Sequence, residues 1–224
     1  MDDPPRTAAE ALSQLHQEDP WFAYPEAVDL LSGLPAGEVP ALAAALDEPS
    51  AKIRAAVARA LGAYRLPSAR AALGRALADA DPTVRRAAIG ALASWPDAPT
   101  IAALGQVAAA DHDLYTRLAA IQTLGTLGTA AMAPLAALLT GAETADPLLL
   151  GQAAEALAAA DPVAARDPLI ALLAHPEAAV REAALAALTP IAGRAEAPAV
   201  RAYAAREPDP YLAAQAHALA ARLA

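Results

Sequence analysis

The sequence contains no cysteine and few aromatic residues. Its 224 residues include two Trp, five Tyr and one Phe, whereas nearly one residue in three is alanine. The absence of cysteine excludes a disulfide scaffold, a thiolate zinc site and a cysteine nucleophile. Because β-branched and aromatic residues are scarce, the composition favours closely packed helices over a sheet.

The sequence predicts neither a transmembrane segment nor a secretory signal. Residues 118–142 are uncharged and long enough to span a bilayer. They are interrupted by threonine, glycine and proline, and residues 125–129 are expected to form a turn between two helices. The start of the chain is acidic where a signal peptide is basic and then apolar, so we expect a cytoplasmic protein with no membrane contact.

Positive charge is scarce overall and concentrated in one block. The net charge is −9, yet residues 52–86 carry eight basic residues and only two acidic ones. A nucleic-acid binder needs a positive face that displaces counterions, so the acidic whole argues against that function. The basic block 52–86 keeps nucleic-acid binding as an alternative. The basic residues of the block are Lys52, Arg54, Arg59, Arg65, Arg70, Arg75, Arg85 and Arg86.

The sequence repeats itself about every 31 residues. Segment 84–92, VRRAAIGAL, has counterparts at 53–61, 116–124, 149–157, 180–188 and 211–219. Stepping back 31 residues from Leu61 reaches Leu30, which makes seven units. Numbering position 0 as the first residue of each segment, the apolar residues fall at 0, +4, +7 and +8, which is one face of a helix. Asp-Pro pairs at Asp81, Asp146 and Asp209 predict capped helix starts.

Alanine- and leucine-rich segments between these helices predict another helix in every unit. Each unit is then a helical hairpin that cannot bury its apolar face alone, so neighbouring hairpins must stack into an all-α solenoid. We predict a single domain over 1–224, with a capping unit at 1–34 and six repeats of about 31 residues in 35–224. The acidic residues Glu10, Glu18, Asp19, Glu26 and Asp29 would make the first unit a polar cap. The additional helices are expected at about 7–17, 38–46, 68–78, 98–109, 129–140, 162–174 and 196–206.

The motif Val-Arg-x-x-Ala-x-x-Ala-Leu, with an acid in the preceding turn and a proline in the preceding helix, resembles HEAT repeats, most of all the short bacterial type called phycobilisome-lyase HEAT-like repeats. The resemblance implies a right-handed α-α superhelix of about seven hairpins. It also implies a ladder of turn acids and arginines between successive units. The matching residues are Glu48 with Arg54, Asp79 with Arg85 and Asp111 with Arg117. Leu150 and Leu212 replace the arginine, and Arg181 has His175 in place of an acid, so the ladder should break in the fifth and seventh units.

The outward positions of the second helix in each hairpin are the candidate binding surface. In a solenoid these helices line the concave face, and their outward residues recur once per unit at +2 and +6. The predicted stripe is basic in early units and acidic in later ones, although merely solvated charges would give the same pattern. Tyr64 and Trp95, at +11, either pack between repeats or contact a partner. The candidate residues are Arg59, Arg86, Gln122, Glu155, Glu182 and His217.

No catalytic or metal-binding motif stands out. None of the four histidines is followed by glutamate, so the His-Glu pairs of deoxyhypusine hydroxylases, which also contain HEAT repeats, are absent. Asp111, His112 and Asp113 form the densest cluster of ligand-type residues, and a capped turn accounts for it. We therefore expect no catalytic residue, metal or cofactor.

The prediction for function is a non-enzymatic adaptor that binds another protein along the concave face, of a regulatory or an inhibitor (immunity) type, and that is a monomer. A phycobilin-lyase-like protein or subunit is the alternative implied by the resemblance. The last helix carries a single full charge, at Arg222, and either offers an apolar edge to a partner or a second copy, or is simply an uncharged end.

Overall fold

The computed structural model describes residues 5–18, 24–141 and 146–224, and the regular structure in these ranges is entirely helical. The chain forms two compact units, Met1–Ala103 and Leu104–Ala224. Helix α7 (Ala98–Ala110) contains the boundary between them. The all-α class is confirmed, whereas the single domain over 1–224 stays a prediction.

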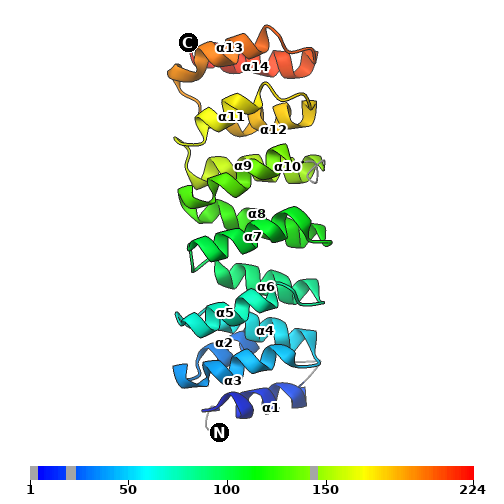
Figure 1. Cartoon of the computed structure of the whole chain (residues 1–224), viewed down its shortest axis with the longest axis vertical. Coiled ribbons are helices and arrows are strands. Elements are labelled where there is room, and N and C mark those ends of the chain that lie inside the picture. Colours follow the sequence, from blue (N-terminus) through cyan, green and yellow to red (C-terminus); the bar gives the residue numbers. More distant parts are fainter. Residues whose placement is uncertain (1–4, 19–23, 142–145) are drawn as a thin grey trace. The chain divides into compact units, whose positions relative to one another are not determined.

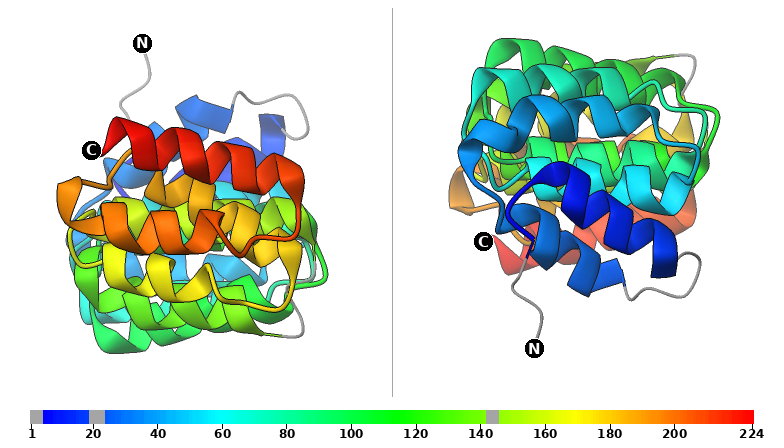
Figure 2. Two further views of the ribbon diagram at one scale, coloured as in Figure 1. Left: turned by 90° about the horizontal axis from the view of Figure 1, so that it is seen from above. Right: turned by 90° about the horizontal axis from the view of Figure 1, so that it is seen from below.

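Each unit consists of alternating first and second helices of successive hairpins (Figure 1). In the first unit, α2 packs against α4 and α4 against α6; in the second, α10 packs against both α8 and α12. Figure 2 shows α13 beside α14 in one view and α1 beside α2 in the other. The first helices are α1 (Ala8–Glu18), α3 (Val39–Ala44), α5 (Pro67–Ala76), α7, α9 (Met132–Thr140), α11 (Arg166–Leu172) and α13 (Ala197–Ala204). The second helices are α2 (Tyr24–Ser32), α4 (Ala51–Leu61), α6 (Pro82–Leu92), α8 (Leu114–Thr126), α10 (Pro147–Ala160), α12 (Ala178–Leu188) and α14 (Pro210–Arg222).

The helix starts follow from local chemistry. The side chains of Asp81, Asp146 and Asp209 each accept a backbone N–H of the first turn, as the Asp-Pro pairs predict. Pro40 and Pro198 lie in the first turns of α3 and α13, where a missing N–H costs no hydrogen bond. A 3-10 turn precedes both helices, at Ala36–Glu38 and Arg194–Glu196.

The core lies between the helices and is made largely of alanine and leucine. In α6 and α12 the positions 0, +4, +7 and +8 are buried, as the periodicity predicts. Small residues let the second helices approach closely. A Cβ added at Gly125 of α8 would lie 3.0 Å from the Cβ and 3.1 Å from the Cα of Ala156 in α10.

The repeat register predicted for the two end hairpins is wrong by one residue. In α14 the buried residues are Leu212, Ala216, Leu219 and Ala220. The cap Asp209 precedes Leu212 by three residues, just as Asp81 precedes Val84, so Leu212 occupies position 0. In α2 the buried residues are Ala27 and Leu31, so Leu31 and not Leu30 occupies +8. Two apolar residues are adjacent in each helix, Leu30 and Leu31 in α2 and Tyr211 and Leu212 in α14. The repeat pattern therefore fitted either register, and the predicted one was wrong.

Acidic side chains of the first hairpin face solvent. Glu10, Glu26 and Asp29 are exposed. The Glu38 carboxylate accepts the N–H of Ala8 at the start of α1 (2.8 Å). Asp19 and the side chain of Glu18 lie outside the described residues.

Candidate protein-binding surface

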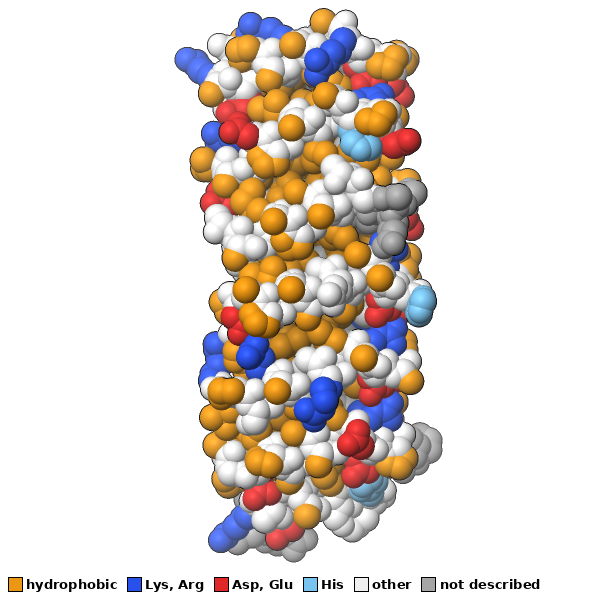
Figure 3. All heavy atoms as spheres, in the orientation of Figure 1, with side chains coloured by type: hydrophobic (Ala, Val, Ile, Leu, Met, Phe, Trp, Pro, Cys, Tyr) orange, Lys and Arg blue, Asp and Glu red, His pale blue; other side chains and the backbone are white. Residues whose placement is uncertain are grey.

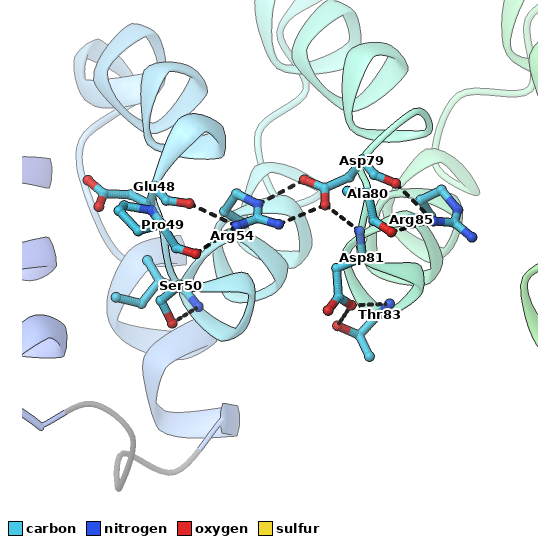
Figure 4. A network of polar contacts seen from close by, with 10 residues as sticks. Glu48, Pro49, Ser50, Arg54, Asp79, Ala80, Asp81, Thr83 and Arg85 are labelled. Atoms are coloured by element: carbon cyan, nitrogen blue, oxygen red, sulfur yellow. Dashed lines mark hydrogen bonds and ion pairs between the residues drawn. The ribbon is translucent and has the colours of Figure 1, made fainter.

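Arginines after position 0 of the second helices connect consecutive turns. Nη1 of Arg54 donates to the carbonyls of Glu48 (2.9 Å) and Pro49 (3.1 Å) in its own hairpin. Nε and Nη2 donate to the Asp79 carboxylate of the next hairpin, each at 2.8 Å (Figure 4). One guanidinium thus closes its own turn and binds the next one.

Arg181 repeats this arrangement in the second unit. Nη1 donates to the carbonyls of His175 (3.0 Å) and Pro176 (2.7 Å), and Nε and Nη2 donate to Glu207 at 2.8 and 2.9 Å. The Glu207 side chain is only 1% exposed. The hydrogen bonds from Arg181 lower the pKa of Glu207 to about 2. In the same way, the hydrogen bonds from Arg54 lower the pKa of Asp79.

The residue pairing expected for this ladder needs correction. The Glu48 carboxylate contacts His16 Nε2 (2.9 Å), and Arg54 reaches only the carbonyl of Glu48. Arg85 likewise donates to the carbonyls of Asp79 (2.9 Å) and Ala80 (3.1 Å). The Arg54 side chain points back over the preceding turn. Its Nη1 therefore meets the carbonyls of that turn, and its Nε and Nη2 face the acid of the following hairpin.

Three further ladder positions are also settled by the structure. Arg117 donates from Nε to the carbonyl of Ala108 (2.8 Å), and Asp111 accepts the N–H of Asp113 (2.9 Å). The buried Leu150 occupies the arginine position in α10. In α14 the corrected register gives that position to Ala213 instead of Leu212.

The two candidate aromatic residues differ in exposure. Tyr64 is buried, and its hydroxyl donates to the carbonyls of Leu31 (2.6 Å) and Leu34 (3.0 Å), which ties α4 to the preceding hairpin. Trp95 is partly exposed, and the Cζ of Arg65 lies 6.0 Å from the centre of the Trp95 ring. Arg65 also donates to the carbonyl of Ser94 (2.6 Å). Trp95 is therefore accessible to a binding partner, whereas Tyr64 is not.

In the first unit, the predicted basic positions share one face of the second helices. Arg59 is exposed in the last turn of α4, and its Nη1 lies 2.6 Å from the point where a Cβ on Gly90 of α6 would stand. Arg86 precedes Gly90 by four residues and so lies on the same face of α6. Burial raises the pKa of the Tyr24 hydroxyl, and the charge of Arg59 offsets part of that rise.

In the second unit, the same face is polar and acidic. Nε2 of Gln122 donates to Oε1 of Gln152 (3.3 Å), and Nε2 of Gln152 donates to Oε2 of Glu155 (2.9 Å). The first of these contacts joins α8 to α10, and the second lies within α10. Glu182 is exposed on α12.

His217 does not belong to this stripe. With Leu212 at position 0, His217 occupies +5, a position that is buried at Ala58, Ile89 and Leu185. His217 itself is exposed. The residue at +6 in α14 is Ala218.

The first helices present a different surface. In Figure 3, which shows this side, hydrophobic side chains fill the furrows and charged ones gather mainly toward the edges over α9 and α11. A furrow of about 520 Å³ runs between α9 and α11. It is lined by Ala136, Ala137 and Thr140, by Pro168, Ala171 and Leu172, and by residues 174–176. This lining contains no Asp, Glu, Lys or Arg that could select a charged partner.

The ligand-type cluster around His112 is a capped turn. Asp113 accepts the backbone N–H of Thr116 (2.8 Å) and its hydroxyl (2.7 Å) at the start of α8. Across residues 5–18, 24–141 and 146–224, no three His, Cys, Asp or Glu residues are placed to hold a metal ion. None of the helices in those ranges has the length and hydropathy needed to cross a bilayer.

Three features of this surface were not predicted. These are the pairing of Arg65 with Trp95, the bridging role of Gln152 and the partnership of Arg181 with Glu207. Only the last left a signal in the sequence, because Arg54 and Asp79 are separated by 25 residues and Arg181 and Glu207 by 26.

Comparison with known proteins supports the repeat architecture. Residues 39–125 and 73–140 match the family of HEAT repeats. No curated protein matches the sequence. A chain in the complex of CpcE and CpcF of phycocyanin lyase from Nostoc sp. PCC7120 is similar in structure, with a TM-score of 0.52 and 22% identity over 100% of this chain and 97% of that one. This similarity concerns the fold. Human deoxyhypusine hydroxylase gives a TM-score of 0.45 at 20% identity, over 96% of both chains.

Proposed function

We propose that this chain, whose residues 39–140 match HEAT repeats and whose described residues form stacked helical hairpins, is a non-enzymatic scaffold that binds another protein through the outward face of its second helices. Stacked hairpins repeat the same outward positions on parallel helices, which suits an extended binding surface. The phycocyanin lyase neighbour is itself described as a complex of two proteins. The location proposed for this protein is the cytoplasm.

One observation carries the proposal. The ladder and the helix caps use the charged groups of the turns, whereas Arg59, Glu155 and Glu182, at +2 and +6, are exposed on α4, α10 and α12. The side chain of Arg59 lies over Gly90 and makes no hydrogen bond or ion pair within the described ranges. Because no carboxylate neutralises this guanidinium, its charge is available to a partner.

The basic side chains of the block 52–86 lie on different sides of the hairpins, which argues against nucleic acid as the partner. Arg54 and Arg85 are turned into the ladder, Arg70 pairs with Asp97 (3.2 Å) and Arg75 lies on a first helix. The positive face that counterion release requires is therefore divided between different sides of the hairpins.

Affinity capture from the native host tests the proposal. The wild-type chain is used as bait beside the double variant Arg59→Glu/Arg86→Glu and the control Arg75→Glu, whose arginine is exposed on α5. We expect a protein that the wild type and the control retain and the double variant loses. Retention of every captured protein by this double variant and by Glu155→Gln/Glu182→Gln would show that this face is not the binding site.

A further inference from the structure

We propose that the first unit binds an extended acidic segment of its partner, seated along α6 on Arg86, Arg59 and Arg65. This inference rests on the proposed function, and it names the chemistry that one part of the face recognises. Three steps support it: the sorting of charge, the spacing of the arginine positions along α6, and the aromatic residue Trp95 beyond the end of α6.

The acids of the block 52–86 are all used internally. Asp79 accepts two hydrogen bonds from Arg54 and one from the N–H of Asp81. Asp81 accepts the N–H and the hydroxyl of Thr83 at the start of α6. The carboxylates of the block are thus turned toward the fold, while Arg59 and Arg65 are exposed. The exposed charges that the block 52–86 itself contributes to this face are therefore positive, on a chain whose net charge is −9.

The positions of the arginines match an extended peptide. The Arg59 guanidinium lies over Gly90, four residues after Arg86, which corresponds to about 6 Å along the α6 axis. Alternate residues of an extended chain are about 6.6 Å apart and point to the same side. A bound segment that follows this face of α6 would therefore bring one carboxylate to the Arg59 guanidinium and the next toward Arg86, and the planar guanidinium favours bidentate contacts.

The line of arginines along α6 ends at the aromatic residue Trp95. Beyond the last turn of α6, Arg65 is held over Trp95 at 6.0 Å and bonded to the carbonyl of Ser94. These contacts hold the Arg65 side chain in place before a partner arrives, which lowers the entropy lost on binding. Trp95 adds a partly exposed apolar surface for a side chain next to the acidic residues.

Gly90 allows the geometry to be tested without changing charge. In Gly90→Ala the new Cβ would stand 2.6 Å from Arg59 Nη1, so the flexible guanidinium must leave its seat while α6 itself can remain intact. The matched control is Gly74→Ala, an exposed helical position with nothing within 4 Å of the new Cβ. Both substitutions replace helical glycine with alanine, and only the first displaces a cation.

The experiment measures fluorescence anisotropy of a labelled peptide of alternating glutamate and serine, with alternating glutamine and serine as the uncharged probe. We expect the acidic probe alone to bind, with an affinity that falls as salt rises. Arg59→Ala/Arg86→Ala should weaken binding roughly fivefold to tenfold, as expected for two exposed ion pairs. Gly90→Ala should weaken it about twofold to fivefold, and Gly74→Ala and Arg75→Ala should leave it unchanged.

Equal binding of the two probes, or equal loss in Gly74→Ala and Gly90→Ala, would overturn the inference. So would tighter binding of a single-stranded oligonucleotide that responds to the same substitutions. A captured host protein that is lost with Glu155→Gln/Glu182→Gln and kept with Arg59→Ala/Arg86→Ala would also overturn it. That last outcome would leave the scaffold function standing, with the acidic part of the face as its binding site.

Discussion

Arginine does two tasks at the ladder positions. Its fork of donors lets Arg54 and Arg181 bind two carbonyls of the preceding turn with Nη1 and a carboxylate of the next hairpin with Nε and Nη2. A lysine offers a single nitrogen and could not span both partners. The carboxylate lies about one hairpin ahead in sequence, so the Val-Arg motif indicates where the ladder is without identifying its acid.

The ladder makes stability depend on pH in a defined direction. The pKa of Glu207 is near 2 in the fold and near 4.5 when it is unfolded. The stabilisation is complete above pH 4.5 and is lost as the pH falls toward 2, because the unfolded chain takes up the proton first. Glu207→Gln should lower the free energy of unfolding at pH 7 by about 1–3 kcal/mol.

Urea unfolding at pH 7 and pH 3 checks this prediction. The difference between the variant and the wild type should shrink at the lower pH. Glu182→Gln, at an exposed carboxylate on α12, serves as the control and should change little at either pH. A Glu207→Gln difference of the same size at both pH values would contradict the role given to the ionised carboxylate.

At the scale of elements, the distance between neighbouring helices determines which residues can stand at their contact. Gly125 of α8 meets the backbone of α10 directly, with Ala156 Cα at 3.1 Å and its carbonyl oxygen at 3.2 Å from a hypothetical Cβ. Backbone atoms cannot move aside as the end of a long side chain can. The small residue here is therefore a packing requirement, whereas at Gly74 it is not.

Gly125→Ala should lower the free energy of unfolding by about 1–3 kcal/mol, since α8 and α10 must separate to admit the methyl group. Gly74→Ala should raise it by about 0.5–1 kcal/mol, because alanine loses less conformational entropy in a helix. Chemical denaturation followed by circular dichroism measures both. Equal stabilisation by the two substitutions would mean that α8 and α10 are less tightly packed than described.

At the scale of the whole molecule, each hairpin depends on its neighbours. Leu157 is fully buried in α10, which packs against α8, α9 and α12. Leu61 has the equivalent place in α4 of the first unit. Repeat proteins are stabilised by contacts between adjacent repeats, so damage at one hairpin should remain close to it.

Leu157→Ala should cost about 2–5 kcal/mol and speed hydrogen exchange in α8, α9, α10 and α12 more than in α4 and α6. Leu61→Ala is the reciprocal control and should speed exchange in α2, α4 and α6. Exchange followed by mass spectrometry resolves the two patterns. A uniform increase along the chain in either variant would contradict the local coupling.

The sequence by itself determined the helical class, the repeat and the places of the interior hairpins. Apolar spacing and Asp-Pro caps act within one helix, so local order along the chain contains that information. The same caps also contain the correct register of α14, because Asp209 stands three residues before Leu212. The leucine pattern alone misplaced it, since alanine fits both buried and exposed positions.

Only the tertiary structure decided which charges are free and which hold the fold. Arg54 and Arg59 look alike in sequence, yet the first is bonded to Asp79 and the second lies over Gly90. Tyr64 and Trp95 share a repeat position, and one is buried while the other is partly exposed. Hydrogen bonds and exposure depend on the neighbouring hairpin, which is about 31 residues away and brought close only by folding.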